Sequence, residues 1–377
     1  MKQYPRSVSK GVKTAVAALL FLVVATACHK ELVIWPAYLN TNFNVVFDWT
    51  GIKDASPSVM QFIAFSEEGG DPLEFGFANA AGGTAKLHYG DYRAVAHNDD
   101  SETFYGTGSS WKDYEIFGQT TTLDLYSPMF IASRAVPRGE GSEHEPFVEE
   151  PDRLWVSATT IAFRAGTNGD ETLTMPMKPA TYTYNFTITN VANLEYVTDI
   201  MATVSGMSQS MTPCNLMPSH RHCTIPVKVT VTGKNSIAIT VRSFGHCPGH
   251  EGEGTIISAE PEARHNLVVY ARLTDGSKWY YEYDITGPLH EPDVLPKPSD
   301  PDDPYAPYDP SKPDDPYDPS KPDDPDNPDN PDDPDNPDGP QYDFGLDDLP
   351  FPRPISDDSG VHPEVEEWNE VHQDIDM

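Results

Sequence analysis

Cysteine and histidine side chains supply the one set of residues in this chain with metal-like chemistry. The set consists of Cys214, His220, His222, Cys223, His246, Cys247 and His250. Such side chains bind zinc when several converge on one ion, but these spacings match no recognised zinc pattern. Cys214 and Cys223 flank a short loop between two expected antiparallel strands, where a disulfide would join the strand ends. A disulfide, free thiols and a metal site all stay open. Spacing and export favour the disulfide and no metal, with Cys247 left over as a buried thiol beside Phe244.

Cys28 is the candidate for covalent lipid attachment. Basic residues at positions 2, 6, 10 and 13 precede an apolar run over 15–25, a pattern typical of a secretory signal and too short to span a membrane. Ala25, Thr26 and Ala27 then lead into Cys28, which resembles a bacterial lipobox. The resemblance implies cleavage before Cys28 and acylation of its thiol and amine, palmitate being one such acyl group. Each buried CH₂ contributes roughly 0.8 kcal/mol, so several chains give lasting attachment. An ordinary signal peptide with an incidental cysteine is the alternative.

The remaining candidate chemistry is weak. The chain has no Gly-x-Ser-x-Gly, His-Glu-x-x-His or phosphate-binding glycine loop, so we expect no catalytic residues, no cofactor and no enzyme activity. The Asp-Asn-Pro repeats over 323–338 could bind calcium, but a proline at every third position prevents the chain from wrapping an ion. Trp49, Trp111 and Trp155 could form a glycan-binding platform, although tryptophan on a strand is more often part of the core.

Charge limits the range of partners. The 377 residues carry 25 basic and 59 acidic side chains, a formal charge of −34, and a pI near 4.4 argues against nucleic acid. Residues 299–340 hold 15 Asp against two Lys, and 341–377 hold 11 acids against one Arg. Most of the charge therefore lies at the C-terminal end, behind a mildly acidic body rich in β-forming residues.

Alternating apolar and polar residues position these groups on β-strands. In the first part of the body, runs such as 59–65, 73–77, 92–96 and 122–126 are separated by Gly and Asp turns, and 137–152 is expected as a mobile loop. A second block of strands includes 181–189, 194–204, 224–232, 237–244 and a hairpin over 265–285 with an Asp-Gly turn. Strands at this spacing predict β-sandwiches: one over 28–170 and another over 171–290.

A spacer and a tail follow the two sandwiches. From Pro298 to Pro340 every third residue is proline, which predicts a disordered, extended polyproline spacer over 291–340. Apolar residues return over 341–377, including Trp368, Val371, Ile375 and Met377. An exposed alternating strand invites pairing with a sheet edge, so we expect 368–377 to dock on a sheet, either of this chain or of a neighbouring subunit. A sharp turn is expected at Gly339 or in the Asp-Asn units.

Together with the lipobox, several segments resemble a family of surface lipoproteins from Bacteroides-type anaerobes, similar to the anchor and tip subunits associated with fimbriae. They are 45–49, 69–75, 187–197, 202–207, 243–248, 266–270 and 275–281. The resemblance covers most of 28–290 and again 341–377, and does not require the spacer. It implies two tandem transthyretin-like, Ig-like β-sandwiches.

The function that this resemblance implies is structural. We expect an outer-membrane lipoprotein, facing outward and held by acylated Cys28, that anchors or caps a fimbria or acts as an adhesin. Its partners would be the membrane and fimbrial subunits joined by strand addition. The alternative is a surface glycan-binding lipoprotein that serves a nutrient importer.

Overall fold

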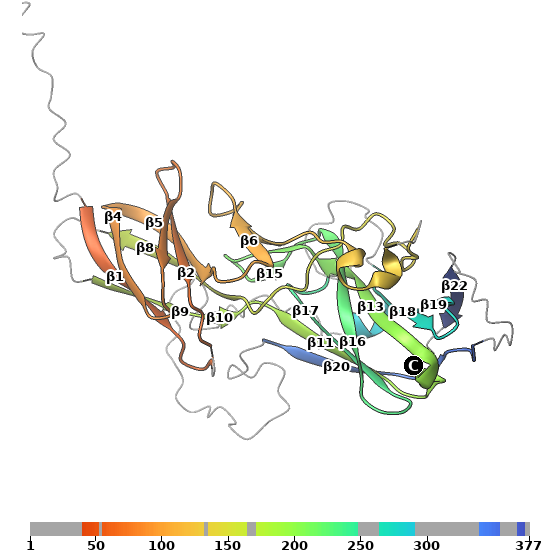
Figure 1. The fold of residues 1–377 in the computed structure, drawn as a ribbon. Helices are drawn as coiled ribbons and strands as arrows, with labels where there is room; N and C mark the ends of the chain where they lie inside the picture. Colours follow the sequence, from red (N-terminus) through yellow and green to blue (C-terminus); the bar gives the residue numbers. More distant parts are fainter. Residues whose placement is uncertain are drawn as a thin grey trace, which may run out of the picture.

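The computed structural model describes residues 40–52, 55–131, 135–163, 171–247, 264–290, 339–354 and 368–373. Almost all of the regular structure is β-sheet, arranged along one axis with the N-terminal strands at one end and the later strands at the other (Figure 1). The prediction of an all-β protein built of sandwiches is therefore confirmed. No helix in the described ranges is long and apolar enough to cross a membrane. Residues 1–39, with Cys28, and most of the spacer lie outside these ranges.

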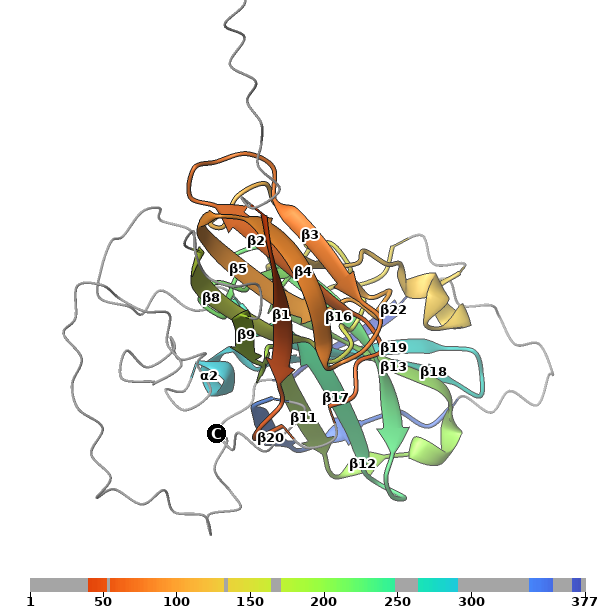
Figure 2. The ribbon, with the colours of Figure 1, turned by 90° about the vertical axis from the view of Figure 1, so that its left-hand side faces the viewer.

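The first sandwich packs a three-stranded sheet on a five-stranded sheet (Figure 2). The three-stranded sheet has the order β4 (Gly82–His88), β1 (Asn40–Asp48), β9 (Glu171–Pro176). The five-stranded sheet has the order β10 (Lys178–Pro179), β8 (Trp155–Phe163), β5 (Gly90–Asn98), β2 (Met60–Ser66), β3 (Leu73–Phe77). β1 and β9 are parallel, and the other pairs are antiparallel. Since β9 and β10 pair with β1 and β8, strands of this sandwich continue past the expected boundary at residue 170.

Alternation along the strands builds the first core. Phe43, Val45 and Phe47 of β1 are buried, and Asn44 between them is exposed. They pack with residues from β2, β4 and β5 in one cluster. β2 is buried on both faces, as its composition predicts, because a further sheet covers its other side.

This further sheet joins the two halves of the chain. Its order is β15 (Met217–Pro218), β14 (Ser210–Thr212), β7 (Glu115–Gly118), β6 (Phe104–Thr107). Phe104 and Ile116 from the first half and Met211 from the second pack against Ile63 and Val95 of the five-stranded sheet. The two sandwiches are thus connected by shared core and not by a bare linker.

The second sandwich is one eight-stranded sheet folded on itself. Its order is β20 (Gln341–Leu346), β11 (Tyr182–Ile188), β17 (Ile237–Ser243), β16 (His222–Val231), β13 (Val197–Ser208), β18 (Asn266–Leu273), β19 (Lys278–Asp284), β22 (Trp368–Gln373). β16 pairs with β13 up to Lys228 and with β17 from Val229 onward, so it carries the sheet round the corner. Side chains from both halves of the sheet meet in one core.

Short elements complete the fold. They are the 3₁₀ turns η2 (Leu123–Leu125), η3 (Pro128–Phe130) and η4 (Leu194–Tyr196), the helical turn α2 (Thr286–Leu289), and the two-residue parallel pair β12 (Val191–Ala192) with β21 (Leu349–Pro350). The expected strand over 122–126 is wrong. Leu123 and Leu125 would share one face of a strand, but in the 3₁₀ turn Leu123 is buried and Leu125 is 73% exposed.

The segment expected as a mobile loop, 137–152, is also different from the prediction. It is irregular but packed on the second sandwich, with Ser142, Glu145 and Val148 buried. The Glu145 carboxylate accepts hydrogen bonds from the Gly206 amide and from the Thr224 hydroxyl, at 3.1 and 2.7 Å. The loop was predicted because the segment has few apolar residues. Hydrogen bonds, and not apolar packing, hold much of it in place.

Candidate strand-docking site

The C-terminal tail occupies both edges of the eight-stranded sheet. β20 lies parallel to β11 at one edge, and β22 lies parallel to β19 at the other. In Figure 1 the two tail strands, drawn in blue, are on opposite sides of the second sandwich. This strand-docking site is the candidate functional site, because it is where sequence predicts contact with a subunit or with the chain's own sheet.

β20 is held along its whole length. Its register runs from Thr183 opposite Gln341 to Ile188 opposite Leu346. The Phe344 ring stacks on Phe186, with ring centroids 5.1 Å apart and planes 20° apart. The alternation of Tyr342, Phe344 and Leu346 toward the core is the signal that would have predicted this strand.

From the end of β20 onward, three apolar side chains of the tail are buried in the core of the second sandwich. They are called the plug: Leu346, Leu349 and Phe351. Leu346, Leu349 and Phe351 are at most 4% exposed and belong to the same core as β11, β17 and β19. Phe351 packs edge-on against Tyr281, with ring centroids 5.3 Å apart. Burying such side chains contributes roughly 1.5–3 kcal/mol each, so this plug is the strongest attachment of the tail.

Two tyrosines of the core donate hydrogen bonds to backbone carbonyls next to the plug residues. Tyr281 donates its hydroxyl to the Pro350 carbonyl at 2.8 Å, and Tyr283 donates to the Asp348 carbonyl at 3.1 Å. Burial raises the pKa of both phenols above their usual value, which keeps them protonated as donors. Asn193 Nδ2 also donates to the Phe351 carbonyl at 2.6 Å.

Gly339 lies two residues before β20 and has a backbone conformation that favours glycine. Gly339 has φ +75°, and a Cβ at this position would lie 2.1 Å from the Thr181 carbonyl oxygen. Only glycine fits such a conformation and such a close approach without strain. The left-handed backbone of Gly339 suits the sharp turn expected there, and the residues before it lie outside the described part of the chain, so the turn itself stays a prediction. At the far end of β20, the Asp347 carboxylate accepts hydrogen bonds from Thr189 Oγ1 at 2.6 Å and Asn190 Nδ2 at 2.7 Å.

β22 is the segment that sequence analysis singled out for strand addition. Residues 368–373 pair with β19 from Lys278 opposite Trp368 to Tyr283 opposite Gln373. The Trp368 ring packs against Phe130 and Tyr270 on the outer face of the sheet. Residues 374–377, with Ile375 and Met377, lie outside the described part of the chain.

The cysteines do not form the expected disulfide. Cys214, Cys223 and Cys247 are free thiols. Cys223 lies on β16 opposite Met207 of β13 and is fully buried in the core, whereas Cys214 lies in the turn between β14 and β15. Flanking one loop therefore does not bring the two thiols onto the same face. Cys247 is buried, as expected, and burial raises its pKa to about 12.

Among the histidines of the metal-like set, His246 makes its side-chain contacts with other histidines and with a tyrosine. His246 packs with His265 and His290, and its Nδ1 is 2.9 Å from the Tyr184 hydroxyl. His265 Nε2 is 2.9 Å from His290 Nε2. Burial lowers the pKa of His246 to about 3 and that of His265 well below its usual value, so both rings are neutral near pH 7.

No metal centre emerges from these side chains. Within the described ranges, no group of three or more His, Cys, Asp or Glu could hold a metal ion. His250 lies outside those ranges.

The tryptophans considered for glycan binding pack against other side chains. Trp49 and Trp155 meet edge to face with ring centroids 5.8 Å apart, and the Trp49 indole donates to the Ala80 carbonyl at 2.7 Å. Trp111 packs near Phe65 and the Arg93 guanidinium. These rings lie in different clusters and do not form one flat platform.

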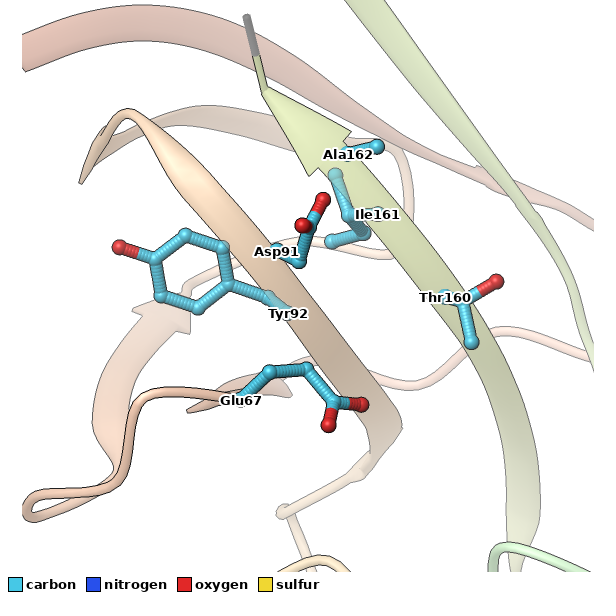
Figure 3. A pocket seen from close by; sticks show the side chains of 6 residues that line it. All are labelled: Glu67, Asp91, Tyr92, Thr160, Ile161 and Ala162. Atoms are coloured by element: carbon cyan, nitrogen blue, oxygen red, sulfur yellow. The ribbon is translucent and has the colours of Figure 1, made fainter.

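A surface pocket of about 460 Å³ lies at the end of the five-stranded sheet (Figure 3). It is lined by Glu67, Asp91, Tyr92, Thr160, Ile161 and Ala162. The Glu67 carboxylate is 2.6 Å from Arg93 Nε, so its charge is already compensated. The pocket is remote from the tail strands, and we assign no ligand to it.

The fold and the docked tail define a class: an all-β protein of two joined sandwiches whose second sheet is completed at both edges by the C-terminal segment. The chain belongs to the family described as Domain of unknown function (DUF5119), whose model matches residues 27–228. A search of curated proteins found no match.

Solved structures include several with a similar fold. A proposed adhesin from Bacteroides ovatus aligns with a TM-score of 0.51 at 20% identity, over 75% of this chain and 97% of that chain. The fimbrial anchor protein Mfa2 of Porphyromonas gingivalis aligns at 9% identity and a TM-score of 0.36, over 62% and 77%. The tip fimbrial protein Mfa3 of the same organism aligns at 8% identity and a TM-score of 0.30, over 65% and 81%. The first likeness shows a shared fold, and no argument is built on the other two. The expected similarity to adhesins of Bacteroides-type anaerobes is confirmed at the level of the fold.

Proposed function

We propose that this chain is a cell-surface protein of adhesion, acting as an anchor or tip component of a fimbria or as a related adhesin. The observation that carries the proposal is the fold shared with the Bacteroides ovatus protein over 97% of its length. The docked tail supports it, because a sheet completed by a separate strand offers an edge that a neighbouring subunit can use. The role needs no catalysis and no cofactor.

The proposal includes attachment to the outer membrane through acylated Cys28, with the body facing outward. β1 begins at Asn40, twelve residues after Cys28, so the first sandwich would lie near the membrane and the second farther out. In Figure 1 the start of β1 and the last strand, β22, are at opposite ends of the described structure, and β20 runs along the lower side of the second sandwich. Contact with a fimbrial subunit would then be made at the outer end, by strand addition at the edges where β20 and β22 lie.

Two measurements on the native cell envelope test this role. Affinity purification of the tagged protein after mild crosslinking should recover a fimbrial subunit, and deletion of the gene should reduce fimbriae or adhesion. A glycan array provides the contrast: binding to a sugar that is lost in Trp111→Ala, with no fimbrial subunit recovered, would replace this function by the glycan-binding alternative.

The membrane attachment is tested separately. Cys28→Ala should move the protein from the outer-membrane pellet to a soluble or inner-membrane fraction, because acylation and maturation both need the Cys28 thiol. His29→Ala is the matched control and should stay in the pellet. A Cys28→Ala protein that still sediments with outer membranes after a high-salt wash would exclude the lipid anchor.

A further inference from the structure

Trp368, the first residue of β22, is enclosed by aromatic side chains. Its ring stacks on Phe130, with centroids 5.7 Å apart and planes 24° apart, and meets Tyr270 edge-on at 5.3 Å. Phe130 and Tyr270 are themselves in edge-to-face contact at 5.3 Å. The Lys278 ammonium lies 5.6 Å from the centroid of the Trp368 ring. Trp368 therefore completes a closed set of contacts on the outer face of β18 and β19.

Phe130 comes from a distant part of the chain. It belongs to residues 122–131, which contain η2 and η3 and lie between β7 and β8 in sequence. Leu123, Met129 and Phe130 are buried against Met201, Val268 and Tyr280 of the second sandwich. This segment, here called the clip, is thus an insertion from the first half that covers the sheet next to β22.

Polar contacts also tie the clip to the sheet, in addition to the packing of Phe130 on Trp368. The Ser127 hydroxyl donates to the Asp199 carboxylate of β13 at 2.5 Å, and it accepts a hydrogen bond from the Met129 amide at 3.1 Å. Shortly after the clip, the Tyr270 hydroxyl donates to the Pro137 carbonyl at 2.7 Å. The clip is therefore attached to the sheet at Ser127, and the chain is attached again at Pro137. Phe130 lies between these two points, where it contacts Trp368.

The short tail strand needs such a support. β22 has six residues and, among the described strands, is the outermost of its sheet, paired there with β19 alone. Residues 355–367 separate it from the buried plug at Phe351, so the plug does not hold β22 directly. The aromatic contacts of Trp368 supply burial that the strand's backbone alone does not provide.

We propose that the clip is a latch for the last strand: β22 stays on the sheet because Trp368 is held between Phe130 and Tyr270, and the clip in turn is ordered by Trp368. Release of β22 removes the stacking partner of Phe130, so strand and clip loosen together. Through this coupling, docking or release of β22 changes the order of the clip, which belongs to the first half of the chain. It is a property of the fold and stands whether or not the chain acts at a fimbria.

Hydrogen–deuterium exchange on the full mature chain tests the latch. Trp368→Ala should raise amide exchange in 123–131 by about ten-fold or more, and Phe130→Ala should do the same for 368–373, since each aromatic contact suppresses local opening. Leu125→Ala is the matched control: it lies in the same clip but is 73% exposed, so exchange should stay at the wild-type level in both segments.

The outcomes separate a latch from a general loss of stability. Exchange in β11 and β16 serves as the internal reference and should be unchanged in all variants, and Trp368→Phe should restore most of the protection because it keeps a stacking ring. If Trp368→Ala leaves 123–131 as protected as in the wild type, or if Phe130→Ala leaves 368–373 unaffected, the clip does not hold the strand and the proposal is wrong.

Discussion

Tyr281 and Phe351 lie on opposite sides of the proline-rich spacer in sequence, yet their rings pack edge-on with centroids 5.3 Å apart. The same tyrosine donates its hydroxyl to the carbonyl of Pro350, the residue before Phe351. One side chain of β19 thus makes both an apolar and a polar contact with the plug. The two contacts differ in expected strength, and that difference can be measured.

Phe351→Ala should lower the free energy of unfolding by about 3–5 kcal/mol, because it empties a fully buried site. Tyr281→Phe keeps the ring and removes one hydrogen bond, so its cost should be about 1–2 kcal/mol. Asn185→Ala, which removes exposed hydrogen bonds with Asp343 of β20 and Thr240 of β17, should cost no more than about 0.5 kcal/mol. Urea denaturation of the three variants gives the order. If the Phe351→Ala protein is as stable as the Asn185→Ala protein, burial of the plug does not stabilise the docked tail.

Truncation distinguishes the two parts of the tail. Removing 365–377 deletes β22 alone and should lower the melting temperature by a few degrees, since about 1 kcal/mol corresponds to roughly 2–4 °C in a chain of this size. Removing 341–377 also deletes β20 and the plug, and should lower the melting temperature much further. Calorimetry of both truncations against the full mature chain provides the measurement. Equal melting of the first truncation and the full chain would mean that β22 adds nothing to stability.

Gly339→Ala should destabilise the docked tail by about 1–3 kcal/mol, because alanine must either adopt a positive φ or push against the Thr181 carbonyl. Gly345→Ala is the matched control in the same strand: its φ is not positive and no atom lies within 4 Å of the added Cβ. That substitution should be neutral or slightly stabilising. Both are read from denaturation midpoints, and similar losses in the two variants would contradict a special role of Gly339.

Acid should weaken the second sandwich through its buried histidines. The pKa of His246 and of His265 is lowered in the folded state, so the stability linked to them is complete above the ordinary histidine pKa and is lost as pH falls below it, for His246 down to about 3. Each histidine should cost about 1 kcal/mol between pH 6.5 and 5.5, and the slope should approach about 1.4 kcal/mol per pH unit below that window. Unfolding is measured between pH 6.5 and 5.5. Glu145 and Glu150, whose pKa values are raised by burial, contribute to the pH dependence with the opposite sign.

A double variant controls this pH dependence. His246→Leu combined with Tyr184→Phe removes the titrating ring together with the hydroxyl that contacts it, so neither of these two groups is left without the other. Its stability should fall less steeply with acid than that of the wild type. An unchanged slope would show that His246 does not titrate on unfolding in this range.

The thiols should differ in reactivity according to burial. In a Cys28→Ala form, native protein should react with a thiol reagent at half-buried Cys214 first, while Cys223 and Cys247 should react only after unfolding. Burial raises the pKa of all three thiols, most strongly at Cys223 and Cys247. Peptide mapping without reductant checks the same point, and a Cys214–Cys223 linked peptide would contradict the structure.

Local patterns predicted most of the strands but not their partners. The apolar run over 59–65 and the alternation over 181–189 identified β2 and β11, because a strand covered on both faces is apolar throughout and a half-buried strand has a period of two. The parallel pairs β11–β20 and β19–β22 depend on long connections, and nothing near Gln341 or Trp368 indicates which edge each strand joins.

The sequence also did not indicate which side chains of a segment point into the core. Cys214 and Cys223 have a spacing that suits a disulfide, but Cys223 faces the core because of the register of β16 against β13. Residues 122–126 of the clip were predicted as a strand because Leu123 and Leu125 alternate, whereas in the structure this segment forms one 3₁₀ turn and a second follows from Pro128. In each case the tertiary environment, and not local preference, decided the outcome.

The occupation of both sheet edges by one tail has a consequence for synthesis and aggregation. β11 and β19 are made before the tail leaves the ribosome, and their sequences, Tyr182–Ile188 and Lys278–Asp284, are rich in tyrosine and other β-forming residues. Until 341–373 arrives, each presents an open row of backbone donors and acceptors to any nearby chain. The nascent protein thus passes through a stage that is prone to intermolecular β-pairing, and its own last residues end that stage by covering the two open edges.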